Sequence, residues 1–402
     1  MTQLPLRYTL RNILRRKTRT LLTVFGFALV IGAVVFMLAF SRSLASTFRQ
    51  TGDADNMIII SKKAQNFVLS SISAQNADQL KHKLHDSAKT FTPDPGDSGA
   101  EAEQALISPE VYIGLNVDVE GAERFRKGHQ RALLHGVLPE MAFRINSTMR
   151  LVDGRLPRPG MRELIVGSTA STRIGVSDES LGTGSQIWML NKKWKVVGKF
   201  EAPGTMMDCE IWAHVNDLQV YLRRQDYSFI RVKLDNPADM PALCNRLSTD
   251  EQFEVKAFPE QTYFAAYAEG FDYFRRFAQV MAIIIIGGGL VAGMNTMYTS
   301  VLGRIREIGT LQVIGFSKKS VLLAILTESL LIALVGGGIG CFLGYLANGQ
   351  PMKIPMAAFR VNVDLTVYLW AMIAAILIGL GGAYVPARRA LKLRMVDAVR
   401  YQ

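Results

Sequence analysis

The sequence has 402 residues, of which 49% are hydrophobic, and it carries a formal net charge of +12. Long uninterrupted apolar stretches argue against a wholly soluble protein. The positive charge does not indicate nucleic-acid binding, because the basic residues cluster beside those stretches while the long segment 42–276 is nearly neutral.

Four segments are long and apolar enough to cross a membrane. A bilayer core of about 30 Å requires about 20 helical residues, and a single segment in lipid must be helical to satisfy its backbone. Three of the segments contain no charged residue and the fourth contains one, Glu328. We therefore predict transmembrane helices at residues 20–41, 277–303, 320–348 and 365–385.

The basic residues indicate which ends of these spans face the cytoplasm. Residues 1–20 hold six Lys or Arg, residues 303–320 hold four and residues 386–402 hold five, with only two acidic residues among them. By the positive-inside rule these segments are cytoplasmic and meet anionic membrane lipids. The segment 42–276 and the short loop 349–364 are then on the outer side.

Residues 1–19 are predicted to form a cytoplasmic, basic amphipathic helix before the first span. Leu6, Leu10 and Leu14 share one helical face and arginines lie beside it, as in helices that lie in the membrane interface. A plain basic tail that only sets the topology is the alternative. The first span is longer than the apolar core of a signal peptide, so we expect an uncleaved anchor.

The outer segment 42–276 has a mixed α/β pattern. Its predicted elements are a strand at 56–60, a hairpin at 181–201 that turns at Asn191–Lys192, and a strand–helix–strand unit at 228–258. Residues 86–105 are rich in Pro, Gly, Ser and Asp and predict a flexible loop. Residues 260–276 have a helical pattern that continues into the second span. The fold class is therefore four transmembrane helices with a large α/β extracytoplasmic domain inserted between helices 1 and 2, held by helical stalks.

No motif for catalysis or nucleotide binding occurs in the sequence. The glycine-rich GTGSQI at 182–187 lacks the Lys and Ser/Thr with which a P-loop holds phosphate. We therefore predict a non-catalytic chain with no cofactor or metal of its own. Cys209 and Cys244 share the outer segment, where an oxidising compartment permits a disulfide, but spacing alone leaves open whether they are bonded.

Glycines recur at helical spacing inside two of the spans. Gly289 and Gly293 lie four residues apart in the second span, and Gly336, Gly340 and Gly344 continue that spacing in the third. Small residues at this spacing let helices approach closely in lipid. The pattern therefore predicts packed helix interfaces, with general helix flexibility as the alternative.

Two polar residues fall within the spans. Glu328 in the third span must face protein or water. A proton-coupling site is one hypothesis, and a structural pairing with a cytoplasmic base is the simpler one. Asn295 in the second span is a comparable polar group, for which a structural hydrogen bond is likewise the simpler interpretation.

The segment 304–319, RIREIGTLQVIGFSKK, is compact, basic and longer than a simple connector requires. Gly309 and Gly315 can break or turn a helix there. A short rigid element between two spans on the cytoplasmic side suits docking onto a cytoplasmic partner.

Three stretches resemble the FtsX/MacB/LolC type of ABC transporter permease. They are LRYTLRNILRRKTRTLLTVFGFALVIGA at 6–33, RIREIGTLQVIGFSKKSVLLAILTESLLIALVGGGIG at 304–340 and PARRALKLRMVDAVRYQ at 386–402. In the outer segment HGVLPEM, LVDGRLP, ELIVGSTAS and WKVVGKFE are similar to the MacB-type core domain, while residues 56–110 match less well.

The resemblance implies a location in the bacterial cytoplasmic (inner) membrane and a partnership with an ABC-type ATPase. That subunit is expected on a separate polypeptide, which would bind the ATP and Mg²⁺. A second copy of this chain or a similar permease is implied, and a periplasmic adaptor is a further candidate partner. The residues implied to couple to the ATPase are Arg306, Glu307, Ile308, Gly309 and Gly315.

The implied mechanism is mechanotransmission, in which ATPase closure moves the outer domain through the membrane helices. By analogy the substrate is a hydrophobic or amphipathic molecule that is exported or extracted. The alternative is an FtsX-like regulator of an extracytoplasmic enzyme that transports nothing.

Overall fold

The computed structural model describes residues 17–92, 103–119, 130–354 and 357–392. The predicted amphipathic helix before the first span and the end of the C-terminal tail lie outside the described residues. The chain divides into two compact units. The helical unit comprises residues 1–43, 272–350 and 361–402, and the α/β unit comprises residues 44–271 and 351–360.

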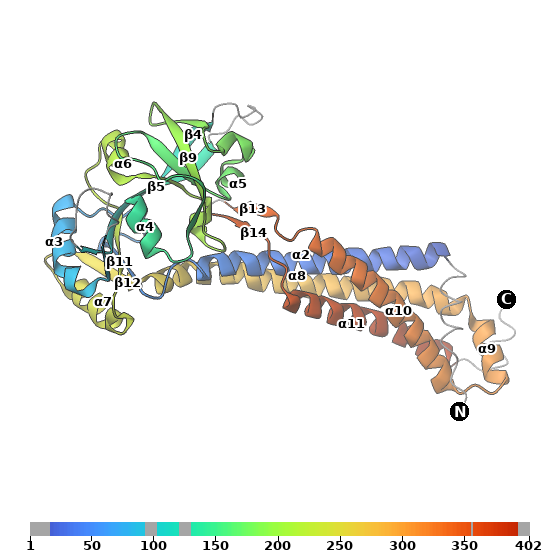
Figure 1. The fold of residues 1–402 in the computed structure, drawn as a ribbon. Coiled ribbons are helices and arrows are strands. Elements are labelled where there is room, and N and C mark those ends of the chain that lie inside the picture. Colours follow the sequence, from blue (N-terminus) through green and yellow to red (C-terminus); the bar gives the residue numbers. More distant parts are fainter. Residues whose placement is uncertain (1–16, 93–102, 120–129, 355–356, 393–402) are drawn as a thin grey trace. The chain divides into compact units, whose positions relative to one another are not determined.

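Among the described residues, four helices are long and apolar enough to cross a membrane, which confirms the predicted fold class (Figure 1). They are α2 (Lys17–Arg49), α8 (Glu260–Leu302), α10 (Lys318–Tyr345) and α11 (Leu365–Ala390). With 33 and 43 residues, α2 and α8 are much longer than the about 20 residues that a bilayer requires. Each is one unbroken helix that belongs partly to both units.

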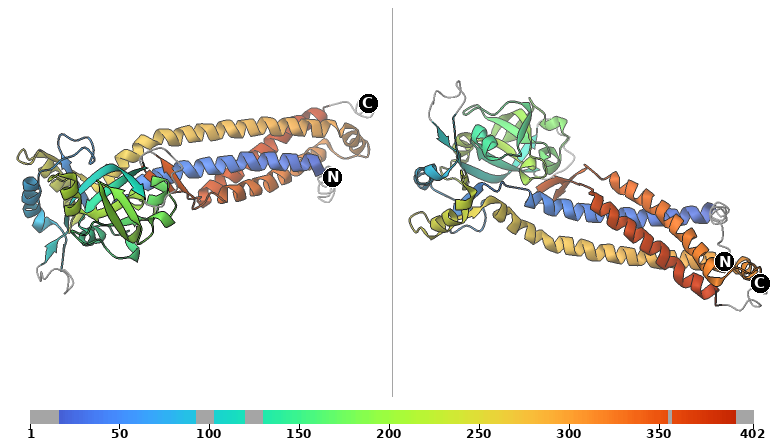
Figure 2. Two further views of the ribbon diagram at one scale, coloured as in Figure 1. Left: turned by 90° about the horizontal axis from the view of Figure 1, so that it is seen from above. Right: turned by 60° about the horizontal axis from the view of Figure 1, so that its bottom comes forward.

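Glycines allow the helices of the helical unit to pack closely against one another. A Cβ on Gly340 of α10 would lie 2.8 Å from the Ala28 carbonyl oxygen of α2, and one on Gly344 would lie 2.3 Å from the Val35 side chain. Gly289 of α8 lies against both Val30 of α2 and Ile378 of α11. The five glycines singled out in the sequence thus face neighbouring helices of the same chain, and both views of Figure 2 show α2 running beside α8.

The short helix α9 (Ile305–Val313) joins α8 to α10. Its Ile308 packs into a buried cluster with Val301 of α8, Val321 of α10 and Ala387 of α11. Gly315 has φ +103°, a conformation that favours glycine, and Ser317 then caps α10 by accepting a hydrogen bond from the Ser320 amide.

A ten-stranded sheet forms the centre of the α/β unit, in the order β12-β1-β11-β4-β5-β10-β7-β9-β6, with β8 pairing β4 and β9. The strands are β1 (Asn56–Ser61), β4 (Ile107–Val119), β5 (Gln130–Val137), β6 (Arg150–Gly154), β7 (Glu163–Gly167), β8 (Gln186–Met189), β9 (Lys192–Glu201), β10 (Ile211–His214), β11 (Phe229–Lys233) and β12 (Val255–Pro259). Two-stranded pairs are formed by β2 (Thr90–Phe91) with β3 (Gln104–Ala105), and by β13 (Pro351–Ile354) with β14 (Ala357–Arg360).

This sheet carries two lobes with separate cores. In the first lobe, α3 (Ala74–Leu84) and α7 (Met240–Thr249) pack on β1, β11 and β12 through residues such as Leu80, Ile230 and Leu247. In the second lobe, the helices are α4 (Pro139–Ile145), α5 (Ala170–Ile174) and α6 (Val215–Leu222). Four 3₁₀ turns complete the unit: η1 (His85–Ser87), η2 (Glu179–Leu181), η3 (Met206–Cys209) and η4 (Pro237–Asp239).

The long strand β4 belongs to both lobes. Its residues up to Glu110 pair with β11, and its residues from Val111 onward pair with β5. The position at which β4 changes partner is therefore the junction of the two lobes.

Two local predictions need correction, and one open question is answered. The hairpin turns at Leu190–Asn191, both with φ near +50° to +58°, one residue before the predicted turn; two positive φ values match the twist of the flanking strands. The expected loop at 86–105 has ordered ends, because β2 and β3 pair with each other. Cys209 and Cys244 are free thiols, which answers the question that their spacing left open.

Candidate functional site

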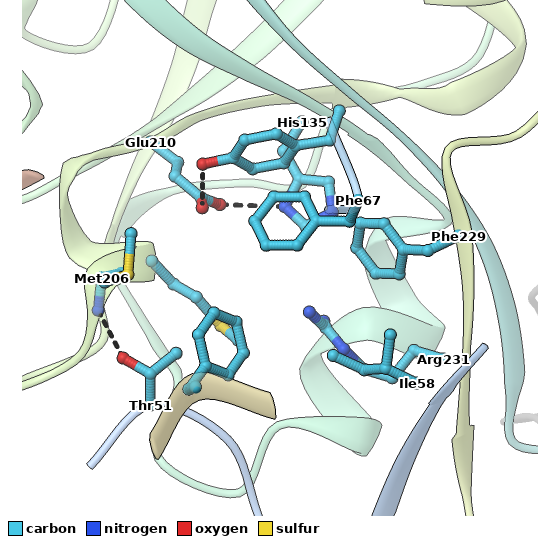
Figure 3. Close-up of a pocket in the computed structure, with 11 residues that line it drawn as sticks. Thr51, Ile58, Phe67, His135, Met206, Glu210, Phe229 and Arg231 are labelled. Atoms are coloured by element: carbon cyan, nitrogen blue, oxygen red, sulfur yellow. Dashed lines mark hydrogen bonds and ion pairs between the residues drawn. The ribbon is translucent and has the colours of Figure 1, made fainter. Parts of the chain in front are cut away.

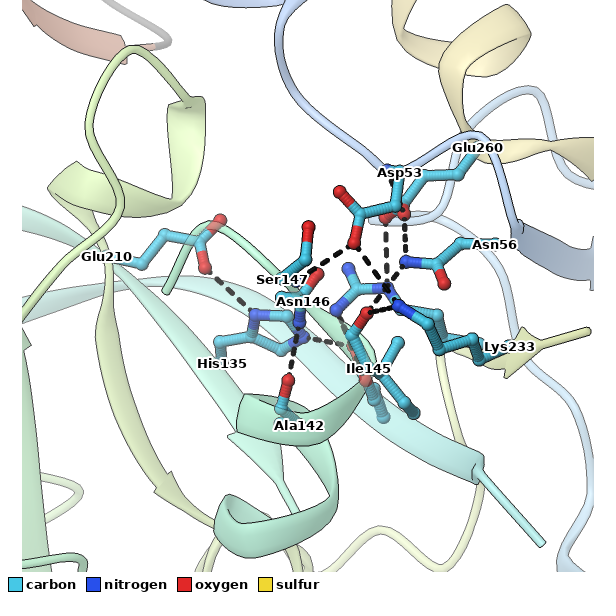
Figure 4. A network of polar contacts seen from close by, with 12 residues as sticks. Asp53, Asn56, His135, Ala142, Ile145, Asn146, Ser147, Glu210, Lys233 and Glu260 are labelled. Atoms are coloured by element: carbon cyan, nitrogen blue, oxygen red, sulfur yellow. Dashed lines mark hydrogen bonds and ion pairs between the residues drawn. The ribbon is translucent and has the colours of Figure 1, made fainter. Parts of the chain in front are cut away.

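A network of buried polar side chains occupies the junction of the two lobes (Figure 4). Its centre is His135 of β5, which is 1% exposed. The ring Nε2 lies 2.7 Å from Glu110 of β4, and Nδ1 lies 2.9 Å from Glu210 beside β10. Both ring nitrogens thus face carboxylate oxygens, and a protonated imidazole donates a hydrogen bond to each.

The electrostatics of this clamp favour the charged histidine. Burial by itself lowers the pKa of His135, but Glu210 and Glu110 outweigh it and raise that pKa to about 9. Burial likewise raises the pKa of Glu110, yet Arg231 and His135 prevail and hold it below its usual value. His135 and Glu110 therefore form an ion pair at neutral pH.

Glu210 collects further donors from the second lobe. The Tyr112 hydroxyl donates to it at 2.9 Å and the Trp212 indole Nε1 at 2.8 Å. Burial and the neighbouring Glu210 raise the pKa of Tyr112 well above its usual range, so the hydroxyl remains a donor. The carboxylate is thereby fixed in one orientation toward His135.

Arg231 of β11 extends the network toward the start of α8. Its side chain is 2% exposed and lies 3.4 Å from Glu110 and 3.0 Å from Glu260, the first residue of α8. Burial lowers the pKa of Arg231, but the two glutamates outweigh it and raise that pKa. A buried guanidinium is tolerated only with such partners.

The chain that follows α2 closes the network from the other side. Glu260 accepts hydrogen bonds from the Asn56 amide at 2.7 Å and from the Asp53 backbone at 3.2 Å. Gly52 has φ +93°, and a Cβ there would lie 2.5 Å from Glu260 Cγ, so only glycine fits. Lys233 bridges Asp53 at 3.4 Å and the Ile145 carbonyl at 2.8 Å.

Thr51 ties the same end of α2 to the second lobe. Its hydroxyl donates to the Thr47 carbonyl at 2.7 Å and accepts from the Met206 amide at 2.9 Å. The end of α2, the start of α8 and both lobes are consequently joined within one buried set of contacts.

Two cavities adjoin this network. A small one of about 10 Å³ lies between Phe67, Phe229, His135 and Arg231 (Figure 3), which is room for about one water. A larger one of about 220 Å³ shares Phe67 and Tyr112 with it and is lined in addition by Arg131, Arg173 and Tyr267.

In the helical unit, α9 presents some of the predicted coupling residues and buries others. Arg306, Glu307 and Gly315 are exposed, whereas Ile308 and Gly309 are buried. The exposed surface continues over Val313 and Ile314, which are 65% and 69% exposed. Ile308 and Gly309 fix α9 on the bundle, whereas Arg306 and Glu307 of α9 and the following Gly315 lie at the surface.

Glu328 of α10 forms a bidentate ion pair with Arg304, the residue before α9. The two Nη atoms lie 2.6 and 2.7 Å from its carboxylate oxygens, and both side chains are nearly buried. This geometry corresponds to the pairing hypothesis and connects α9 to the third span. Asn295 of α8 is exposed, and its backbone carbonyl accepts a hydrogen bond from Thr299.

The cysteines are not reactive centres. Burial raises the pKa of Cys209 to about 12 and that of Cys244 to about 11, so neither is a thiolate at neutral pH. Cys209 lies in η3 and Cys244 packs against the core of the first lobe.

Sequence reasoning did not identify the network, although one signal was present. Glu110, His135 and Arg231 each lie next to an apolar residue within a buried part of a strand: Glu110 precedes Val111, His135 follows Leu134, and Arg231 lies between Ile230 and Val232. A charged residue within a buried strand requires a partner, and this pattern could have indicated a polar core, but not which residues meet.

Together, the four apolar helices, the α/β unit inserted after the first of them and the α9 connector define a multi-pass membrane protein with an extracytoplasmic domain. Residues 20–249 match the MacB-like periplasmic core domain, and residues 279–395 match the FtsX-like permease C-terminal region. The chain therefore belongs to the MacB/FtsX-type family of ABC transporter permeases.

The matches to relatives cover different shares of the relatives' lengths. The uncharacterized ABC transporter permease YknZ of Bacillus subtilis (strain 168) is 20% identical, over 99% of this chain and 98% of YknZ. The macrolide export ATP-binding/permease protein MacB of Nitrobacter winogradskyi is 24% identical over 95% of this chain, which spans only 58% of that MacB. The crystal structure of the periplasmic region of MacB from Actinobacillus actinomycetemcomitans matches with a TM-score of 0.36 and 12% identity, over 52% of this chain and 90% of that one.

Proposed function

We propose that this chain is a non-catalytic membrane subunit that couples ATP hydrolysis by a separate cytoplasmic ATPase to movement of its α/β unit. The movement would export or extract a hydrophobic or amphipathic molecule. The relative from Nitrobacter winogradskyi carries the name of a macrolide exporter, which agrees with this substrate class.

The observation that carries the proposal is the continuity of α2 and α8. At about 1.5 Å per residue their 33 and 43 residues correspond to about 50 and 65 Å, well beyond a hydrocarbon core of about 30 Å. Thr51 just after α2 and Glu260 at the start of α8 belong to the buried contacts that join the two lobes. Displacement of either helix would therefore act directly on the junction.

The other end of this path would be the exposed side of α9 with Arg306, Glu307 and Gly315. We propose that it docks on the ATPase, and that the Arg304–Glu328 ion pair conveys its movement to α10. In this arrangement both termini and residues 304–319 are cytoplasmic, residues 42–276 lie outside the inner membrane, and two permease chains assemble on two ATPase copies.

The test is purification of the chain in mild detergent with its cellular partners, followed by measurement of vanadate-sensitive ATP hydrolysis. Glu307→Arg should retain expression and melting temperature but lose transport-coupled hydrolysis. The matched control is Glu251→Arg, an exposed acidic residue of the α/β unit. A preparation without any ATPase, or unchanged coupling in Glu307→Arg, would contradict the proposal. Intact coupling with a bound cell-wall enzyme and no cargo would instead indicate an FtsX-like regulator.

A further inference from the structure

The cavity of about 220 Å³ is built by both lobes and by α8. Aromatic rings form much of its wall: Phe67 follows β1, Tyr112 belongs to β4, and Phe264 and Tyr267 project from α8. Phe67 and Tyr112 meet edge to face with ring centroids 4.7 Å apart, which gives a rigid apolar surface.

The same cavity is lined by two arginines, Arg131 of β5 and Arg173 of α5. No acidic side chain is among the described residues that line it. Arg173 is only 9% exposed, so its charge is directed into the protein rather than into bulk solvent. The buried Arg173 guanidinium attracts an anion more strongly than it would in water, and Arg131 adds a second positive charge at the exposed side of the cavity.

Gly114 shapes the polar end of the cavity. A Cβ at this position would lie 3.1 Å from Arg131 Nε and 3.3 Å from its Nη2. The absence of a side chain on this residue of β4 allows Arg131 to lie flat across the strand. A larger residue would displace the guanidinium.

The size of the cavity limits the ligand. An apolar cavity of about 150 Å³ holds benzene, and sites for drug-sized molecules begin at about 300 Å³. A cavity of about 220 Å³ therefore holds an anionic head group with the first part of an apolar chain, rather than an entire lipid.

We propose that this cavity binds the head of an anionic amphipath, with Arg131 and Arg173 holding its carboxylate or phosphate and the rings of Phe67, Phe264 and Tyr267 holding its chain. This inference deepens the proposed function and rests on it for the biological role of the ligand. Phe67, Tyr112, Met206 and Phe264 also line the small cavity beside His135 and Arg231. The ligand would thus contact the wall behind which the network joins α2 and α8 to the lobes.

Equilibrium binding to the full chain in nanodiscs, with empty nanodiscs subtracted, tests this proposal. The probes share one octyl chain and differ in head group: octanoate, octyl phosphate, octanol and octyltrimethylammonium. Saturable binding is expected for the two anions only. Preference for octyl phosphate would indicate a lipid head group as the natural source, and preference for octanoate a free carboxylate; both support an anion site.

Arg131→Gln, Arg173→Gln and Gly114→Val should each weaken anion binding by about tenfold or more, the effect of losing roughly one charge-assisted contact. Arg246→Gln, which alters an exposed arginine of α7 remote from the cavity lining, should not. Arg131 is exposed, so its variant should keep the parental melting temperature even if the buried Arg173→Gln does not.

The proposal would be overturned if octanol and octyltrimethylammonium bound as tightly as the two anions. Unchanged anion binding in Arg131→Gln would also overturn it. Neither result depends on an ATPase. The cavity inference can therefore fail while coupled hydrolysis is intact, and coupled hydrolysis can fail while the cavity still binds anions.

Discussion

The helical unit and the α/β unit differ in what holds each of them together internally. In the helical unit, glycines of α8 and α10 bring backbones together, and Gly340 approaches Ala28 and Gly32 of α2. In the α/β unit, the junction of the lobes consists of charged side chains, with Glu110, His135 and Arg231 almost fully buried. One unit depends on the absence of side chains, and the other on the exact pairing of long ones.

The difference follows from the surroundings of each unit. Between helices in lipid there is little hydrophobic driving force, so close packing of small residues supplies the attraction. In the α/β unit the hydrophobic cores of the two lobes are already separate, and ion pairs lie at the junction between them beside the rings of Phe67 and Phe229. Such pairs contribute little net stability but strongly disfavour arrangements that separate the partners. The junction is thus suited to hold one relative arrangement of the lobes.

The largest effect is expected from Arg231→Met. This change leaves Glu110 and Glu260 buried without their cation, and breaking a buried pair in this way costs about 3–5 kcal/mol. Thermal unfolding, followed by tryptophan fluorescence of the purified chain, should show a much lower midpoint.

The matched control is Arg150→Met, because Arg150 also pairs with a glutamate, Glu201, but its side chain is 70% exposed. An exposed pair contributes at most about 1 kcal/mol. Adding Glu260→Gln to Arg231→Met should restore part of the loss. Equal midpoints for the two arginine variants would refute a special role of burial.

An intermediate effect is expected from pH, and only in the α/β unit. The pKa of His135 is raised from 6.5 to about 9. Its contribution to the free energy of unfolding is therefore complete below pH 6.5 and is lost as pH rises through 9. The pKa of Glu110 is lowered from 4.5, so its contribution is complete above pH 4.5 and is lost as pH falls below that value. The stability of this unit should therefore be greatest between about pH 4.5 and 6.5.

The measurement uses a Trp370→Phe chain, because Trp370 lies in α11 and the remaining three tryptophans lie in the α/β unit. Trp212 donates to Glu210 and thus reports on the network itself. Unfolding midpoints would be compared across pH with those of the same chain carrying His135→Gln. Parallel losses of stability above pH 7 in both chains would exclude His135 as the titrating group.

The sequence predicts well the helices and strands whose pattern lies within one contiguous stretch of residues. Uninterrupted apolar runs predicted the four long helices, and the pattern at 260–276 predicted that α8 begins long before its apolar part. The residues NMIII predicted β1. The hairpin lies where the sequence predicts it, but its turn begins one residue earlier, because Leu190 adopts positive φ together with Asn191.

The network is invisible to such reasoning because its members are distant in sequence. His135 contacts Glu110 and Glu210 from 25 and 75 residues away, and Arg231 reaches Glu110 from 121 residues away. Only the order of the strands brings them together, since β4 pairs with β11 on one part of its length and with β5 on the next. By contrast, Glu328 stood out as the single charge in its span, and Arg304 was among the few bases near enough to pair with it.

The smallest effect on stability is expected in the helical unit, from Gly340→Leu. A side chain here meets the backbone of α2 at 2.8–3.0 Å, so the helices must separate, and overpacking of this kind costs about 1–3 kcal/mol. Gly338 is the matched control, because it lies two residues away on α10 and nothing lies within 4 Å of a Cβ there.

Gly338→Leu should therefore unfold at the same temperature as the parent chain in detergent, while Gly340→Leu should unfold at a lower temperature. The decrease in the unfolding midpoint of Gly340→Leu, relative to the parent chain, should be the same at every pH between 5 and 9. The missing pH dependence is the informative part, because it separates packing of backbones from pairing of charges. A Gly340→Leu chain whose loss varies with the protonation of His135 would mean that the two units are energetically coupled in the resting protein. Cohesion in the helical unit would then depend on the same ion pairs that hold the lobes.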